Sequence, residues 1–216
     1  MRCSLLALSL LLPLTAMATD QDINKISDDI RIESGQHAGD LSAVSGDIEV
    51  GDHAVVGDVN SISGLITVGR EAQVTDLGTV SGNIRVGKGA VAKGNIGTVS
   101  GHIELSPGAQ VKGHVAGVSQ SITLDDARVS GGIETATGDI TIGAGSIVEG
   151  GILVTQPQRG NVHFGSGHAP TVVIGPKAVV KGTLEFRQEV VLKVSNSAQI
   201  GTVKGATPEM FSGAAP

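Results

Sequence analysis

The heptapeptide Val44-Ser45-Gly46-Asp47-Ile48-Glu49-Val50 decides the fold, because close copies of it recur along most of the chain. Its isoleucine returns in steps of 18, 18, 18, 19, 19 and 18 residues, at Ile30, Ile48, Ile66, Ile84, Ile103, Ile122 and Ile140. A hydroxyl residue stands three positions earlier each time, at Ser27, Ser45, Ser63, Ser81, Ser100, Ser119 and Thr137. A constant period with fixed aliphatic and hydroxyl positions is typical of a solenoid, in which each turn stacks on the previous one.

One repeat, residues 44–62, shows how a single turn is built. Val44, Ile48 and Val50 alternate with polar neighbours, which predicts a strand with one buried side. Gly51 and Asp52 then end that strand, as turn residues do. Small residues recur at a later position of the turn, namely Ala54, Ala72, Ala90, Ala109 and Ala127. Three short strands joined by glycine-containing corners therefore form a roughly triangular coil with a narrow aliphatic interior.

The predicted fold class is all-β: a single-stranded β-helix (β-solenoid) of about nine turns with triangular coils of ~18 residues. The additional residue of the 19-residue turns falls in the corners at 93–97 and 113–115. Aliphatic residues also fall on a six-residue grid that is typical of left-handed β-helices, at Val50, Val56, Ile62, Val68, Val74, Val80 and Val86. The 19-residue turns break this grid, so a right-handed coil is favoured over a left-handed one.

The ends of the chain predict export. Residues 1–18 combine Arg2, an apolar run from Leu5 to Leu14 and the small-residue site Ala16-Met17-Ala18, as in a secretory signal peptide. The rest divides into an N-terminal cap or lead-in at 19–25, regular solenoid repeats at 26–154, a loop excursion at 155–170, C-terminal solenoid turns at 171–204 and a tail at 205–216. We expect a periplasmic or extracellular, cell-surface location, with no transmembrane segment in the mature chain.

Composition restricts the partners. The chain carries 15 basic against 21 acidic residues, with no basic cluster, which argues against nucleic acid as a partner. Its one cysteine, Cys3, lies in the predicted leader, so the mature chain has no thiol. There is no Trp or Tyr and only three Phe, so the aromatic platforms that usually recognise carbohydrate are almost lacking.

Two further columns have a structural interpretation. The serine column is expected to satisfy its own hydroxyls and the corner amides, and the glycines at 46, 64, 82, 101 and 138 are expected at tight or positive-φ corners. Arg85 is expected to stack over Glu104 as an exposed ion pair.

The repeats carry two family resemblances. Residues 44–50, 80–86 and 99–105 resemble the repeat of secreted bacterial adhesin-type β-strand proteins. Residues 87–96 and 107–115 resemble bactofilins, which are polymer-forming bacterial scaffold proteins with a β-helical core. The two resemblances together imply a β-helical fold over roughly residues 26–204, and the second implies self-association. Bactofilins are mostly cytoplasmic, whereas this chain begins with a predicted export signal.

Residues that could carry chemistry are sparse. Asp125 and Asp126 form an acidic pair after a strand, which could serve a polysaccharide-active β-helix enzyme, although adjacent residues on a strand point to opposite faces. Zinc requires three convergent ligands, and the histidines at 37, 53, 102, 114, 163 and 168 are too scattered to supply them. We predict no catalytic residue, no cofactor and no metal, and hence no enzyme.

The function predicted from sequence is non-enzymatic: an exported bacterial β-solenoid with a structural, self-associating or adhesin-like role in the cell envelope. Self-association would occur end to end, since both ends of a stack present unpaired strand edges. An alternative is a rigid binding module that recognises an envelope or surface partner through the 155–170 loop, with Arg159, His163, Phe164 and His168 as contacts. A lesser alternative is the polysaccharide-active enzyme.

Overall fold

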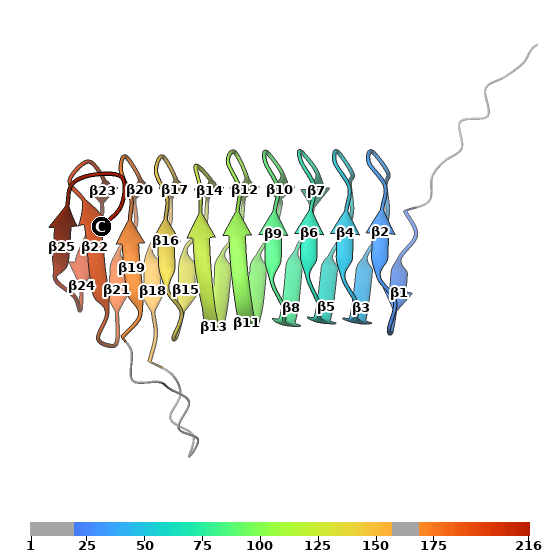
Figure 1. The fold of residues 1–216 in the computed structure, drawn as a ribbon, viewed down its shortest axis with the longest axis horizontal. Coiled ribbons are helices and arrows are strands. Elements are labelled where there is room, and N and C mark those ends of the chain that lie inside the picture. The colour runs from blue at the N-terminus through green and yellow to red at the C-terminus, as the bar shows by residue number, and fades with distance from the viewer. Residues whose placement is uncertain (1–19, 157–168) are drawn as a thin grey trace, which may run out of the picture.

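The computed structural model describes residues 20–156 and 169–216, and within these ranges the chain forms 25 β-strands and no helix. The strands stack in parallel into an elongated coil (Figure 1) of about nine turns. The predicted all-β solenoid is therefore confirmed. The preference for a right-handed coil stays a prediction.

The strands form three faces, and every turn from the third to the ninth contributes one strand to each face. The first face consists of β1 Ile23–Lys25, β3 Leu41–Ser45, β5 Val59–Ser63, β8 Leu77–Ser81, the first half of β11 Ile96–Leu105, the first half of β13 Val115–Leu124, β15 Ile133–Thr135, β18 Ile152–Val154, β21 Leu184–Phe186 and β24 Val203–Lys204. The second face consists of β2 Ile30–Ile32, β4 Ile48–Val50, β6 Ile66–Val68, β9 Ile84–Val86, the second halves of β11 and β13, β16 Ile140–Ile142, β19 Thr171–Ile174, β22 Val191–Ser195 and β25 Pro208–Phe211.

The third face is made of two-residue strands: β7 Gln73–Val74, β10 Val91–Ala92, β12 Gln110–Val111, β14 Arg128–Val129, β17 Ile147–Val148, β20 Val179–Val180 and β23 Gln199–Ile200. Isolated bridges extend it through Val55 to His37. β11 and β13 run through a corner without a break, so they join the first and second faces into one hydrogen-bonded sheet.

The strand register pairs equivalent residues of successive turns. The predicted isoleucine column is confirmed on the second face, where each isoleucine from Ile30 to Ile140 pairs with its equivalent one turn on. These side chains, the alanine column and the inward valines are buried in one continuous core. Burying one such Ile or Val side chain contributes roughly 1.5–3 kcal/mol, and no single turn could bury its apolar side alone.

The additional residue of the longer turns lies where the sequence predicted it. Two residues separate β7 from β8, whereas three separate β10 from β11 and three separate β12 from β13. An insertion in this corner lengthens the connection without shifting the ladders on either side.

Strand pairing extends beyond the predicted solenoid boundaries. β1 lies within the segment expected to be a lead-in and pairs with β3. β25 lies within the segment expected to be a tail and pairs with β22 over Leu192–Ser195. The stacking therefore begins before residue 26 and continues past residue 204, to Phe211.

Part of the predicted core is wrong, because several aliphatic residues point outward. Val44, which the alternation placed with Ile48 and Val50 on a buried side, is 43% exposed. On the six-residue grid, Ile62 and Val80 are 50% and 49% exposed, while their grid neighbours are buried. The serine–glycine corner, where Gly64 has φ +135°, reverses the direction of the chain and restarts the inward–outward alternation. A period counted across that corner therefore mixes inward and outward residues.

The glycine corners are confirmed in their main features. Gly46, Gly64 and Gly101 have positive φ, as predicted. At Gly82 and Gly138 φ lies outside that region, but a Cβ at either position would collide with the backbone carbonyl one turn earlier, Gly64 O or Gln120 O. These corners are therefore tight throughout.

A ladder of acceptor side chains holds the corner before the first face. The Asp40 N–H donates to Asp22 Oδ1 at 2.9 Å, and the Asp58 N–H donates to Asp40 Oδ1 at 2.8 Å. Further along the stack, Asn95 Oδ1 accepts from the His114 N–H at 2.9 Å, and His114 Nδ1 accepts from the Gly132 N–H at 3.0 Å. Each of these side chains satisfies a corner amide of the following turn, where an ordinary β-ladder is interrupted.

Replacing Asp40 by alanine should lower the free energy of unfolding by about 1 kcal/mol, because the Asp58 N–H loses its acceptor. Asp40→Asn keeps an acceptor oxygen and removes one charge from the Asp22, Asp40, Asp58 column, so it should match or exceed wild type. Urea denaturation followed by far-ultraviolet circular dichroism measures both variants. Equal losses for the two variants would contradict the hydrogen-bonding role.

Candidate interaction surface

An exposed row of aliphatic side chains runs along the first face. We call it the aliphatic ridge, and its members are Ile26, Val44, Ile62, Val80, Val99 and Val118. Their exposed fractions lie between 43% and 75%, although side chains of this type are normally buried. Each is the last outward residue before the serine of its turn, so the ridge follows the stacking axis at the strand spacing of ~4.8 Å.

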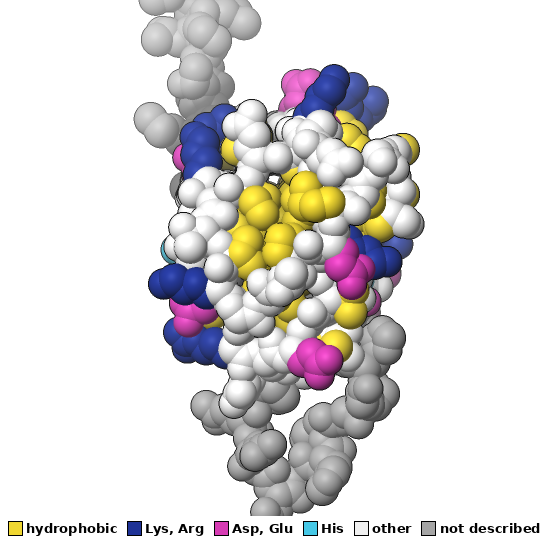
Figure 2. All heavy atoms as spheres, turned by 90° about the vertical axis from the view of Figure 1, so that its left-hand side faces the viewer, with side chains coloured by type: hydrophobic (Ala, Val, Ile, Leu, Met, Phe, Trp, Pro, Cys, Tyr) yellow, Lys and Arg dark blue, Asp and Glu magenta, His cyan; other side chains and the backbone are white. Residues whose placement is uncertain are grey.

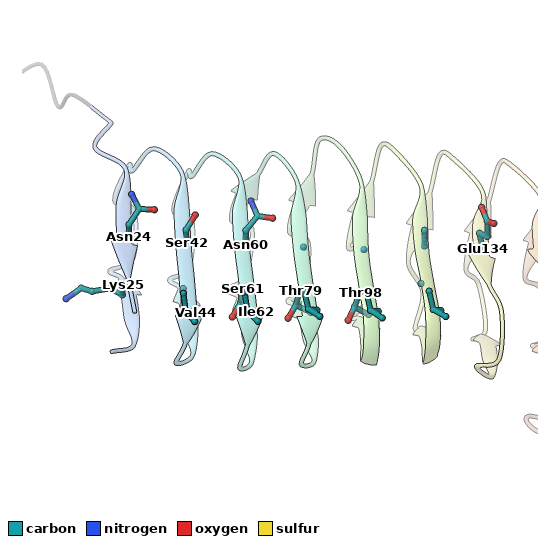
Figure 3. Close-up of a pocket in the computed structure, with 18 of the residues that line it drawn as sticks. Asn24, Lys25, Ser42, Val44, Asn60, Ser61, Ile62, Thr79, Thr98 and Glu134 are labelled. Atoms are coloured by element: carbon teal, nitrogen blue, oxygen red, sulfur yellow. The ribbon is translucent and has the colours of Figure 1, made fainter. Parts of the chain in front are cut away.

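A second outward row lies two residues before the ridge. It consists of Asn24, Ser42, Asn60, Gly78, Gly97 and Ala116, and we call it the trough. At its centre Gly78 and Gly97 have no side chain, so the valines beside them stand above the surface. Ridge and trough together border a shallow groove of about 1130 Å³ (Figure 3).

Below the groove lies a column of buried polar side chains. Ser61 Oγ donates to Ser63 O at 3.1 Å, and Thr98 Oγ1 donates to Ser100 O at 3.2 Å. Gly117 replaces the hydroxyl residue one turn later, and the buried Gln120 side chain fills the space. The Gln120 amide lies 2.9 Å from Thr98 O and 3.2 Å from Gly117 N, which satisfies both. Thr79 lies between Ser61 and Thr98 in this column, and its buried Oγ1 has no hydrogen-bond partner among the described residues.

Charge is confined to the ends of the groove. Lys25 lies at the first turn, where its ammonium group is 3.8 Å from Asp28, and the exposed Glu134 lies at the last. The five turns between them present no charged side chain on either the ridge or the trough. The second face is different: Arg85 Nε lies 3.4 Å from Glu104 Oε2, which confirms the predicted ion pair, and Arg31 pairs with Glu49.

The C-terminal end of the coil exposes the core. Met210 of β25 pairs with the buried Val194 and occupies the same inward position, yet 58% of it is exposed because no further turn covers it. Ile200 and Val203 of the last turn are likewise only partly buried. Figure 2 shows the resulting apolar patch at the centre of this end, with charged side chains around its margin.

The candidate chemical residues within the described ranges are not brought together. Asp125 and Asp126 lie exposed in a corner, and Asp126 has a φ of +42°, a turn conformation. His53 pairs with Glu71 at 3.4 Å and His114 belongs to the corner ladder. No group of three or more potential metal ligands occurs within residues 20–156 and 169–216. Asp125 and Asp126 as a polysaccharide-active pair therefore stay a hypothesis.

Arg159, His163 and Phe164, together with His168, lie outside the described residues. Thr155, which precedes that stretch, borders the end of the groove.

In the serine column, the Ser119 and Thr137 hydroxyls lie 2.9 Å apart, which agrees with the expected mutual hydrogen bonding at this pair.

Sequence reasoning missed the ridge, although a signal was present. Valine or isoleucine stands directly before the serine in six successive repeats, a regularity that the core does not explain.

In the part of the chain that the structure describes, no helix is long and apolar enough to span a membrane.

Comparison with known proteins gives no relative: no family model, no curated protein and no solved structure matches this chain. The resemblance to adhesin-type repeats and bactofilins therefore rests on the repeat residues alone.

One charge cluster on the third face makes the stability of the fold pH-dependent. Arg128, and secondarily Lys181, whose ammonium group is 3.4 Å from Glu149 Oε1, lower the pKa of the Glu149 carboxyl below its ordinary value of 4.5. A carboxyl with a lower pKa in the folded state stabilises the fold above its unfolded pKa, and this contribution disappears as the pH falls through the folded pKa.

The variant Glu149→Gln should therefore be less stable than wild type at pH 7, and the difference should shrink as the pH falls below about 4.5. Urea titrations at several pH values measure this. High salt should also reduce the difference, since the pair is exposed to solvent. A difference that is constant between pH 7 and pH 3 would show that the ion pairs are not its cause.

Proposed function

We propose that this protein is an exported, non-enzymatic β-solenoid that associates end to end and serves as a structural element of a bacterial cell envelope. The observation that carries the proposal is the uncovered C-terminal turn, where Met210 occupies a core position without a core neighbour above it.

The last turn combines an apolar end with unpaired strand edges. Among the described residues, β23, β24 and β25 each pair with one strand only, in the preceding turn. An edge of this kind is a template for a further strand. β25 begins with Pro208, which has no N–H to donate, so pairing there would rest on the remaining residues of the three strands.

The first turn offers the complementary edge. In the part of the chain that the structure describes, β1 pairs only with β3, and β2 only with β4. Ile30 and Ile32 at this end point inward like their equivalents in every later turn. The first turn of one copy placed on the last turn of another would continue the parallel ladders and cover Met210. Such head-to-tail contacts are heterologous and generate open filaments.

The predicted export signal supports an envelope role rather than a cytoskeletal one. The leader predicted at residues 1–18 lies outside the described residues. Expression of the full chain in a Gram-negative host, followed by fractionation and N-terminal sequencing, tests this part: we expect a mature protein that begins at Thr19, outside the cytoplasm. Retention of an uncleaved chain in the cytoplasm would contradict it.

Met210→Glu should abolish end-to-end association, because stacking would bury an unpaired charge against the apolar end of another copy. Light scattering on the mature chain over a concentration series measures association, and electron microscopy of the same samples shows its form. Wild type should form rods that lengthen with concentration. The Met210→Glu variant should form rods of one-subunit length at every concentration.

Two control variants separate this effect from loss of fold or added charge. Met210→Leu retains an apolar side chain and should stack like wild type. Thr123→Glu adds the same charge on the second face, away from the end, and should also stack. A wild-type protein that stays monomeric at all concentrations, or a Met210→Glu variant that polymerises normally, would defeat the proposal.

A further inference from the structure

We infer that the ridge and trough form a self-complementary surface, through which two copies of this chain pack side by side with their coil axes parallel. This inference concerns a different face from the proposed end-to-end contact and does not depend on it.

The shape of the first face carries the inference. Within a turn the ridge residue stands two positions after the trough residue, as Val80 does after Gly78 and Val99 after Gly97. Consider a two-fold axis parallel to the coil axis, midway between the two rows. It reverses the strand direction across the contact and brings the ridge of each copy over the trough of the other.

This symmetry matches the copies turn by turn. Each ridge side chain meets the trough residue of the equivalent turn, so Val99 lies over Gly97 of the second copy and Val118 over Ala116 of the second copy. Because both rows repeat at the same strand spacing of ~4.8 Å, the fit holds along the whole groove. The valines then occupy the space that the missing glycine side chains leave, as in packed sheets whose facing side chains interdigitate.

Charge also favours a second copy over another occupant. The chain has a net charge of −6, so two copies repel each other unless the facing surfaces are neutral. The ridge and trough are uncharged from Ser42 to Val118, whereas the second face carries Glu49, Arg85 and Glu104 at its outward positions. The equal periods of ridge and trough match a second copy turn by turn, whereas a flexible apolar ligand has no such repeat.

The size of the face sets the strength of the contact. Six turns at ~4.8 Å and five-residue strands at ~3.3 Å per residue give a flat face of roughly 480 Å² per copy. The total of roughly 950 Å² is below the 1,200–2,000 Å² of stable specific interfaces, so we expect a weak, concentration-dependent dimer.

Exchanging ridge and trough within one turn tests the inference. Gly97→Val alone sets valine against Val99 of the second copy and should weaken the dimer at least about tenfold. Val99→Ala alone leaves a gap and should weaken it by a smaller factor. The double variant Gly97→Val, Val99→Ala exchanges the large and the small residue of this turn in both copies, so valine again faces a small residue. Its dimer dissociation constant should therefore return to within about threefold of the value without these two substitutions.

The substitutions at Gly97 and Val99 are compatible with the fold of the monomer. A Cβ at Gly97 has only Ala116 O within 4 Å, at 3.8 Å, and φ there is not positive, so a side chain can be added there without backbone strain. Val99 is half exposed, so shortening it removes little core packing. All variants are made in the full mature chain carrying Met210→Glu, so that association through the ends does not contribute, and sedimentation equilibrium gives the dimer constants. Thr67→Ala on the second face is the matched control and should leave the constant unchanged.

Recovery of the dimer in the double variant would support the inference, since no other occupant predicts it. A parent protein that stays monomeric up to about 1 mM would overturn it. A double variant that dimerises as weakly as the Gly97→Val single variant would also overturn it. A dimer strengthened by Gly97→Val alone would also contradict the inference, because it would mean that troughs face troughs across antiparallel axes.

Discussion

The structure depends on one constraint: in-register parallel hydrogen bonding between turns about 4.8 Å apart. Because each residue lies directly over its equivalent in the preceding turn, any property of one turn is copied along the axis. An inward isoleucine becomes a buried column, an outward valine becomes a ridge, and a corner aspartate becomes a ladder of acceptors. Surface features of the described residues are therefore lines that follow the stacking axis rather than isolated points.

The same constraint explains why the ends matter. Every internal turn has both its hydrogen-bonding edges and its apolar interior covered by neighbours, but the last turn lacks a neighbour on one side. Met210 shows the consequence most clearly, since its equivalent Val194 is 1% exposed and Met210 itself 58%. A second copy could restore what is missing with contacts that the chain already makes with itself.

Much of the fold follows from the sequence, because the stacking imposes its period on the residues. The period predicted the turns, and the isoleucine and alanine columns predicted the core. The glycine-containing stretches at 93–97 and 113–115 predicted the corners that accept an additional residue. The ridge could not be found by alternation alone. Val44 and Ile48 are four residues apart and share a parity, yet Gly46 lies between them at φ +131°, and the corner turns one side chain outward and the other inward. Periodicity reports that a position is aliphatic; only the path of the backbone decides which side it faces.

The most direct test of the account is electron cryo-microscopy of the mature wild-type chain at high concentration. The account predicts filaments whose subunits repeat every ~48 Å along the axis, because ten strands on each of the first two faces at ~4.8 Å make up one subunit, and the layer spacing continues through each junction. Separate rods of one-subunit length at every concentration would contradict it, and so would filaments in which the layer spacing is interrupted between subunits.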